Sequence, residues 1–415
     1  MLTGTNLKYA NSYNIRIVLE NIRLHGPLSR IDISRSTHLT AQTVTNITKK
    51  LLEAGLIFEA DRHKEGRGAP SIMLKLNPTA AYSIGLDFDK DHLTCILVDL
   101  NGEMCQRLNI DLDFPTPEEA MNLMSEKAEE LIQMEGIDKS KIWGVGVGFP
   151  GPLVVSEGSV RTNAVNPQFL PGWENVPVVR ILEDRLKVPV YLENNASAAA
   201  IGERWYGEGK HISNFFYVFF GAGLGGGLIM NGQLFPGHTG NAGELGYYPT
   251  PDGSDAESMF DRPHLGVYFN LSMLYKKLNS AGYEVKTPSD LDQLYQKNND
   301  ILIDWLKTGT KQLAVPMLAI EYLIDPEVIY FGGRLPNTII EKILNMLQEI
   351  LPTHRIIKKM DAPSLRCATA GQDAAALGLA TLPLYDSFAP VPNLLMKNNR
   401  GEVNSFKSNS NNFHS

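Results

Sequence analysis

The stretch that decides the fold is residues 214–246, NFFYVFFGAGLGGGLIMNGQLFPGHTGNAGELG. Its first part is an apolar, aromatic run, which predicts a buried strand. The glycine-rich run at 221–227 then predicts a tight turn into a second strand. On both sides of this stretch, apolar runs alternate with helical patterns. They include two runs around a turn at 81–100, a helix at 117–135, a strand at 141–153, a strand and alanine-rich helix at 188–207, and a strand at 325–335. This alternation predicts an α/β fold.

The first eighty residues have a different pattern, that of a helix-turn-helix. The first helix is indicated by apolar residues at helical spacing: Ile15, Val18, Leu19 and Ile22. Gly26 and Pro27 end it, and Ser29 caps a second helix at 30–37, where Ile31 and Ile33 are available for packing. Thr40 is a favourable N-cap for a third helix at 41–54.

The third helix is laid out as a recognition helix. An apolar stripe predicts its buried face, and polar residues lie on the other side, near its start. Residues 57–60 and 71–76 then alternate as strands around DRHKEGRGAP, which predicts a hairpin wing. The predicted DNA contacts are Thr40, Gln42, Thr43, Asn46, Lys49 and Lys50 on the helix and Arg67 on the wing. The alternative is a small helical bundle that only dimerises.

Charge separates the same two regions. Residues 1–80 contain eleven basic and six acidic residues, whereas residues 81–415 contain 27 basic and 40 acidic ones. A positive module attracts the phosphate backbone, and an acidic body is repelled by it. Nucleic acid is therefore expected to contact the N-terminal region alone.

The remaining composition excludes several classes of protein. No run of about 18 apolar residues is present, so no membrane span is expected. The first residues lack an apolar signal core, and the three cysteines (Cys95, Cys105 and Cys367) are far apart and odd in number. We therefore expect a cytoplasmic, nucleoid-associated protein without a disulfide framework.

At these motifs the chain resembles a known family. LENNA (192–196), GAGLGGGLIMNGQLFPGHTGNAGELG (221–246) and IDPEVIYFGG (324–333) resemble the ROK family of repressors, open reading frames and sugar kinases. Residues 40–57 and GRGAP (66–70) are similar to its repressor branch. The resemblance implies a winged helix-turn-helix at 1–80, followed by a two-lobed, actin-like (ribonuclease H-like) domain at 81–385 that binds an effector and dimerises. Residues 386–415 are rich in Asn and Ser and are expected to be a disordered tail.

Two departures from the family's kinases argue against catalysis. Those kinases carry an Asn-Asp pair whose aspartate is the general base, and here the pair is Asn194-Asn195. An amide cannot be a general base at neutral pH, although it can still bind a hydroxyl. Their first phosphate loop is Asp-x-Gly-Gly-Thr, whereas residues 87–91 read DFDKD. The second glycine loop, with Gly223, Gly225 and Gly226, is intact; we interpret it as vestigial, a tight turn that comes with the fold.

The resemblance also implies a partly retained sugar pocket. The predicted ligand-binding residues are Asn166, Asn194, Asn195, Glu244 and Tyr247, beside Trp173. Amides and a carboxylate suit polyol recognition, because each hydroxyl can donate and accept. The alternative is that Glu244 and Asn194 only close loops between the lobes. Tyr247 replaces a family histidine, and the family's cysteine-rich zinc loop is absent, so no zinc or other cofactor is expected.

Together these observations predict a DNA-binding transcriptional regulator, a repressor of carbohydrate uptake or catabolism genes. Its partners would be double-stranded operator DNA, a sugar or sugar-phosphate effector bound between the lobes, and further copies of itself in a homodimer or tetramer. Two alternatives remain: an active sugar kinase with a DNA-binding arm, and a regulator that senses a protein partner.

Overall fold

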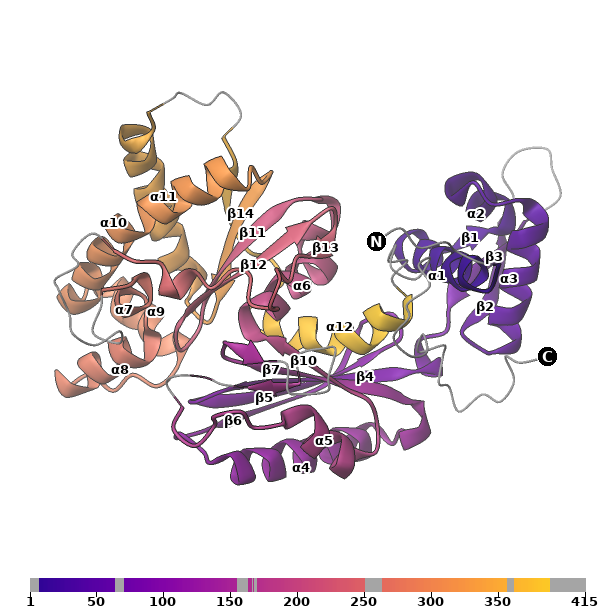
Figure 1. The fold of residues 1–415 in the computed structure, drawn as a ribbon, viewed down its shortest axis with the longest axis horizontal. Helices are drawn as coiled ribbons and strands as arrows, with labels where there is room; N and C mark the ends of the chain where they lie inside the picture. The colour runs from indigo at the N-terminus through magenta and orange to yellow at the C-terminus, as the bar shows by residue number, and fades with distance from the viewer. Residues whose placement is uncertain are drawn as a thin grey trace.

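The computed structural model describes residues 7–63, 71–154, 163–165, 167, 170–250, 263–356 and 362–388, and it places an N-terminal module beside a body with two sheets (Figure 1). The module has three helices: α1 (Leu7–His25), α2 (Arg30–Thr37) and α3 (Ala41–Glu53). A small antiparallel sheet in the order β1–β3–β2 lies beside them: β1 (Leu28–Ser29), β2 (Ile57–His63) and β3 (Ser71–Leu76). The three helices and the strand hairpin are those that the sequence predicts.

Local hydrogen bonds explain where these helices begin. The Ser29 hydroxyl accepts a hydrogen bond from the backbone N–H of Asp32 at 3.2 Å, and the Asp32 carboxylate accepts one from the backbone N–H of Ser29 at 3.1 Å. Both predicted caps are confirmed, because Thr40 likewise accepts from the backbone N–H of Thr43 at 3.2 Å. The predicted packing of Ile31 is wrong: its side chain is 63% exposed, whereas Ile33 is buried. Two residues apart lie on opposite sides of a helix, so only one of them can face the core.

The first sheet of the body has five strands in the order β10–β7–β4–β5–β6. They are β4 (Tyr82–Asp89), β5 (His92–Asp99), β6 (Met104–Asp111), β7 (Ile142–Phe149) and β10 (Val190–Asn194). β4 pairs in parallel with β7 and antiparallel with β5, as expected for a hairpin joined to an α/β sheet. Two helices cover one of its faces (Figure 1): α4 (Pro117–Glu135) and α5 (Val178–Leu186).

The second sheet also has five strands, in the order β13–β12–β11–β14–β15. They are β11 (Phe215–Phe220), β12 (Leu224–Met230), β13 (Gln233–Leu234), β14 (Val328–Gly333) and β15 (Ser364–Cys367). Its outer helices are α7 (Leu265–Tyr268), α8 (Leu271–Ser280), α9 (Pro288–Gln296), α10 (Asp300–Leu323) and α11 (Asn337–His354). The short elements of the body are β8 (Leu153–Val154), β9 (Ala164–Val165), η1 (Pro78–Ala80), η2 (Lys139–Lys141), η3 (Glu208–His211) and η4 (Leu245–Tyr247).

Two helices, α6 (Asn195–Tyr206) and α12 (Ala374–Phe388), cross between the sheets (Figure 1). A Cβ on Gly202 of α6 would lie 2.0 Å from the carbonyl oxygen of Ala374, and one on Gly378 of α12 would lie 1.8 Å from that of Ala198. The two backbones are therefore in direct contact, which only glycine permits. α6 packs against the second sheet, and α12 packs against the first.

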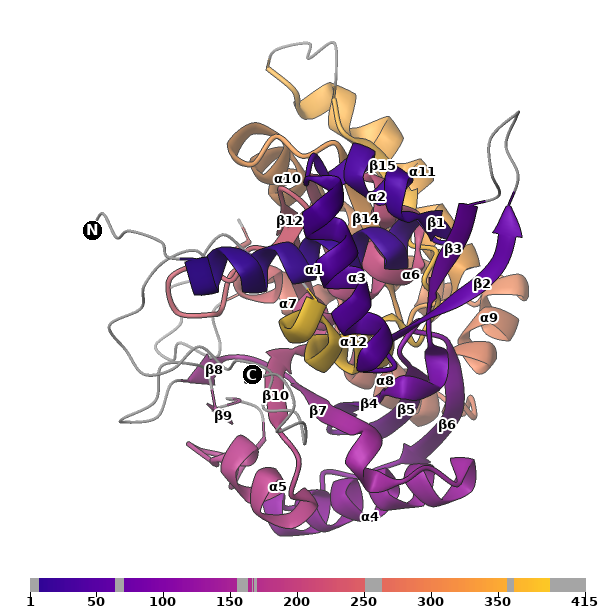
Figure 2. The same cartoon turned by 90° about the vertical axis from the view of Figure 1, so that its right-hand side faces the viewer.

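The N-terminal module shares a hydrophobic core with the body. The cluster contains residues from α1, α3, β3, β5 and α12; its members include Val18, Leu19, Ile22, Val44, Leu74, Ile96, Val98, Ala376, Ala380 and Leu384. Turned by 90°, the molecule shows α12 below α1 and α3 (Figure 2). The orientation of the module is therefore set by buried apolar surface as well as by the connecting chain.

The predicted tail, 386–415, begins inside helix α12, which continues through Phe388. The rest of the predicted tail, 389–415, lies outside the described residues. In the part of the chain that the structure describes, no helix is long and apolar enough to cross a membrane.

Candidate nucleic-acid interface and polyol site

Helix α3 separates apolar and polar residues onto two faces. Val44, Ile47 and Leu51 are at most 2% exposed, as predicted. Four of the predicted DNA contacts are exposed: Gln42, Asn46, Lys49 and Lys50. The amide of Gln42 donates to the Asn46 side-chain oxygen at 3.1 Å, so the two amides lie side by side one turn apart. Amide side chains can bind adenine through two hydrogen bonds in the major groove, and lysines can bind phosphates.

Thr40 and Thr43, which the sequence also predicts as DNA contacts, are engaged at the start of α3. Besides the cap, their two hydroxyls lie 2.8 Å apart. Arg67, the predicted wing contact, lies outside the described residues.

Sequence reasoning missed Arg30, which braces the recognition helix. Its guanidinium donates to the Thr48 hydroxyl of α3 at 3.1 Å and to the Glu59 carboxylate of β2 at 3.2 Å. One side chain of α2 therefore ties α3 to the wing. The only sequence feature that marks Arg30 is that a basic residue stands at the first position of a helix. That feature is too common to identify a functional residue.

In the body, polar side chains from both sheets meet at Gly151, in the loop after β7. A Cβ on Gly151 would lie 2.1 Å from Glu244 Oε1 and 2.8 Å from Asn194 Nδ2. Asn194 ends β10 of the first sheet, and Glu244 follows β13 of the second. We name Gly151, Asn194 and Glu244 the Gly151 cluster. The structure therefore brings together two of the predicted ligand residues, Asn194 and Glu244, and glycine at 151 leaves room for them.

Burial changes the acidity of this cluster. It raises the pKa of Glu244 to about 7. It also raises the pKa of Glu193 to about 7, although the backbone N–H of Asn194 donates to that carboxylate at 2.8 Å and opposes the change. Burial and then the charge of Glu244 raise the pKa of Tyr247 to about 12. Near neutral pH the Glu244 carboxyl group can therefore donate as well as accept hydrogen bonds, as sugar hydroxyls require of a partner.

Asn241, which sequence reasoning missed, holds the segment before Glu244 against β8, the short strand that follows the Gly151 loop. Its side-chain oxygen accepts from the backbone N–H of Leu153 at 2.7 Å, and its amide nitrogen donates to the carbonyl of Leu153 at 2.9 Å. This two-bond contact resembles one rung of a strand ladder. It explains how a loop of the second sheet is fixed beside Gly151.

Asn195 lies deeper than a ligand contact would. It is 4% exposed, and its amide nitrogen donates to the carbonyl of Phe88 in β4 at 2.9 Å. Trp173, expected beside the polyol site, is 1% exposed and packs 5.1 Å from the rings of both Phe88 and Phe149. The indole of Trp173 therefore lies in the core of the first sheet, against Phe149 at the end of β7. Asn166 lies outside the described residues, and Tyr247 is 39% exposed.

The β4–β5 hairpin, which the resemblance places at the first phosphate loop, holds buried charges. His92 lies 2.6 Å from Asp91 and 3.6 Å from Asp87. Burial would lower the pKa of His92, but these two partners outweigh it and raise the pKa to about 9. Burial and the nearby Asp91 raise the pKa of Asp89 to about 6. Carboxylates at this position oppose a triphosphate.

The second glycine loop has a packing explanation. A Cβ on Gly225 would lie 2.7 Å from the Cβ of Ala196, and one on Gly227 would lie 2.6 Å from that of Ala200. Gly226 meets the ring of Phe216 at 2.5 Å and the carbonyl of Gly243 at 2.7 Å. Gly223 alone faces open space. Close packing of β12 on α6 therefore accounts for Gly225 and Gly227, and contact with Phe216 and Gly243 accounts for Gly226, without a bound phosphate.

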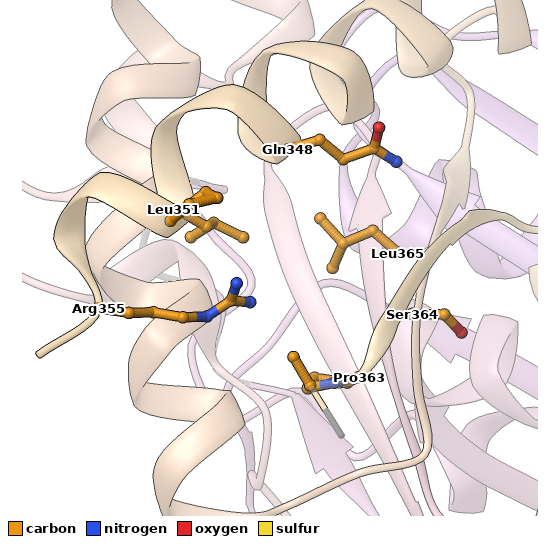
Figure 3. Close-up of a pocket in the computed structure, with 8 residues that line it drawn as sticks. Gln348, Leu351, Arg355, Pro363, Ser364 and Leu365 are labelled. Atoms are coloured by element: carbon orange, nitrogen blue, oxygen red, sulfur yellow. The ribbon is translucent and has the colours of Figure 1, made fainter. Parts of the chain in front are cut away.

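A pocket of about 280 Å³ lies elsewhere, between α11 and β15 (Figure 3). β15 and β13 are opposite edges of the second sheet, so this pocket is remote from Glu244. The Arg355 guanidinium at its wall is paired with the buried Glu321 carboxylate at 2.8 Å. None of the predicted ligand residues lines it.

Metal-binding groups are sparse in the described part of the chain. Among those residues, no three His, Cys, Asp or Glu side chains are grouped so that they could hold a metal ion. Most of the segment aligned with the family's zinc loop, 251–262, lies outside the described residues.

Comparisons with known proteins agree with this geometry. Residues 83–266 match the model of the ROK family. The chain is 26% identical to the xylose repressor of Bacillus spizizenii, over 90% of this chain and 95% of that protein. It is 23% identical to the N-acetylglucosamine repressor of Escherichia coli O157:H7, over 82% of this chain and 84% of that protein.

Superposition on solved structures identifies the fold of this chain. A ROK family transcriptional regulator, described as a homologue of the Escherichia coli MLC protein, superposes with a TM-score of 0.73 at 21% identity, over 92% of this chain and 98% of that one. A ROK hexokinase from Thermus thermophilus gives 0.54 at 24% identity, over 72% of this chain and 96% of that one. The predicted two-lobed fold preceded by an N-terminal helical module is confirmed. The chain therefore carries a ROK family domain.

Proposed function

We propose that this protein is a transcriptional repressor that binds operator DNA through residues 1–80 and responds to a sugar or sugar phosphate. The observation that carries the proposal is the exposed polar face of α3, with Gln42, Asn46, Lys49 and Lys50, on a module braced by Arg30. The relatives named as xylose and N-acetylglucosamine repressors are similar to this chain over most of their length, which supports the same function here.

The effector would bind at the Gly151 cluster, where the two sheets meet. Asn194 and Glu244 provide an amide and a carboxyl group that can each bind a hydroxyl. Residues 81–385 would then form the effector and dimerisation domain. A ligand can change operator binding only if it has different affinities for the DNA-binding and DNA-free conformations.

A kinase reaction is disfavoured at two positions. Asn195 occupies the place of the family's catalytic aspartate, and its amide is held by the carbonyl of Phe88. The β4–β5 hairpin carries Asp89 and Lys90 where the family's kinases have two glycines, and Asp91 where they have a threonine. Losing a general base alone typically costs ~10²–10⁴-fold in rate. We therefore propose that the protein has no kinase activity.

Thermal unfolding and DNA binding together test this proposal. The full-length protein would be screened against D-xylose, N-acetylglucosamine, D-glucose and the 6-phosphates of the last two. A ligand at ~100 times its dissociation constant should stabilise the fold by ~2.7 kcal/mol. The same ligand should release a duplex selected in vitro by the protein, and ADP release with ATP should stay at background. ADP release with one sugar would overturn the non-enzymatic part, and no selected duplex would overturn the DNA-binding part.

A further inference from the structure

Helix α6 reaches from the Gly151 cluster to the N-terminal module. Its N-cap is Asn194, whose side-chain oxygen accepts from the backbone N–H of Ala196 at 2.8 Å, while its amide nitrogen faces Gly151 and Glu244. Its last turn carries Trp205. Twelve helical residues span about 18 Å. One rigid element therefore begins in the proposed effector site and ends at the proposed DNA-binding module.

The far end of α6 is joined to that module by Arg23. The Arg23 guanidinium of α1 lies over the ring of Trp205, 3.8 Å from its centroid. The same guanidinium forms two hydrogen bonds with Glu20, at 2.7 and 2.8 Å, and the Arg23 side chain is only 12% exposed. A partly desolvated, planar cation stacked on an indole is a directional contact. It fixes the angle of α1 against α6.

The remaining contacts prevent α6 from moving alone. The backbones of α6 and α12 touch at Gly202 and Gly378. The Thr381 hydroxyl of α12 donates to the Tyr206 hydroxyl at 3.2 Å. α12 also contributes Ala376, Ala380 and Leu384 to the core shared with α1. A displacement at Asn194 is therefore transmitted to α1 by a helix pair that moves as one unit.

We propose that Trp205 is a positioning residue for operator binding: through Arg23 it fixes the orientation of the N-terminal module on the body and connects operator affinity to the Gly151 cluster. This inference rests on the proposed function. Two recognition helices in a symmetric repressor must match half-sites a whole number of turns apart. A small rotation of the module against the body therefore weakens specific binding without removing any DNA-contacting side chain.

DNA binding tests the proposal with two variants of the full-length protein. Trp205→Ala removes the ring, and Trp205→Phe retains an aromatic face as the matched control. Fluorescence anisotropy would measure binding to a selected operator and to a random duplex at low salt. We expect Trp205→Ala to lose about tenfold or more in operator affinity, random-duplex binding to stay within twofold, and Trp205→Phe to recover most of the loss. Parallel loss on both duplexes, or operator affinity within twofold of wild type, would overturn the proposal.

A distance measurement without DNA separates this inference from the proposed function. Spin labels at Arg35→Cys in α2 and Arg180→Cys in α5 use exposed sites, 79% and 85% accessible, in a background with the three native cysteines replaced. We expect one narrow distance distribution for wild type and Trp205→Phe, and a broadened or shifted one for Trp205→Ala. An unchanged distribution in Trp205→Ala would contradict the positioning role even if the protein bound no operator. A narrow wild-type distribution without operator binding would contradict the proposed function alone.

Discussion

The polar face of α3 and the Gly151 cluster are both candidate binding sites, but their side chains contribute differently to the stability of the fold. Gln42, Asn46, Lys49 and Lys50 are exposed, and among the described residues the hydrogen bond of Gln42 and the ion pair of Lys49 are with partners in α3 itself. In the cluster, by contrast, Asn194 caps α6. Its neighbour Asn195 ties α6 to β4.

This difference teaches how variants should be interpreted. On α3, a loss of binding can be separated from a loss of stability, because an exposed side chain contributes little to folding. Around Gly151 a loss of binding and a loss of stability cannot be separated in this way, because groups that would bind a ligand also hold α6 in place. For the same reason, family resemblance is a weaker guide to function for the residues around Gly151 than for those of α3, because a residue that stabilises the fold can be retained without binding a ligand.

The largest effect is expected on α3. Replacing Gln42 and Asn46 together by Ala should lower operator affinity about 100-fold, since each amide that binds a base contributes ~1–3 kcal/mol to discrimination. The melting temperature should stay within about 1 °C, because both side chains are exposed. Anisotropy titration and thermal unfolding check the two parts. A fall in melting temperature alongside the loss of affinity would contradict the claim that these side chains of α3 act in binding and not in stability.

The lysines of α3 should act through salt. Replacing Lys49 and Lys50 by Ala should reduce the slope of log affinity against log salt by about 2, if each contacts one phosphate. Arg180→Ala, at an exposed basic residue of α5, is the control and should leave the slope unchanged. An equal change in the control would mean that overall charge, and not α3, determines binding.

In the body, Asn195→Asp should destabilise the fold by ~1–3 kcal/mol. An ionised carboxylate cannot donate to the carbonyl of Phe88 and is buried beside it. Kinase activity should not appear, because the β4–β5 hairpin remains acidic. The control is Asn270→Asp, since Asn270 caps α8 and aspartate is an equally good cap. Urea unfolding and ADP release would be measured; a variant as stable as wild type would contradict the buried role of the Asn195 amide, and an active variant would contradict the claim that the acidic hairpin alone prevents catalysis.

Two glycines of one loop should behave differently. Gly227→Ala should cost ~1–3 kcal/mol, because its Cβ would meet Ala200 at 2.6 Å and the carbonyl of Ala196 at 2.7 Å. Gly223→Ala should change the free energy of unfolding by no more than about 0.5 kcal/mol, since no atom lies within 4 Å of that Cβ. Equal costs would remove the packing explanation for the glycines of β12.

The remaining effect is expected from pH. Burial raises the pKa of both Glu193 and Glu244 to about 7, above the usual value of 4.5, so their contribution to stability is fully present below pH 4.5 and is lost as pH rises through 7. Asp89 and His92, with pKa values of about 6 and 9, act in the same direction. The free energy of unfolding should therefore fall between pH 5 and 8. Glu244→Gln should reduce the slope of this fall with pH. An unchanged slope would mean that Glu244 ionises as freely as an exposed glutamate.

The sequence predicts the parts of the fold that depend on local patterns. Caps at Ser29 and Thr40, the 117–135 helix and the strands beside the glycine loop depend on neighbouring residues, and the structure has them. Asn241, Gly151 and the Arg23–Trp205 contact join segments that are distant in the sequence, and no local pattern marks them. The burial of Trp173 could not be predicted for the same reason, because it depends on Phe88 and Phe149, which come from distant strands.

The most direct test of the central claim is quantitative footprinting of the full-length protein on a selected duplex, with and without the sugars and sugar phosphates of the thermal screen. The account predicts protection of a near-palindromic site with half-sites a whole number of turns apart. It also predicts that a compound that stabilises the protein weakens that protection. No sequence-specific protection at physiological salt, or protection that no stabilising compound changes, would contradict it.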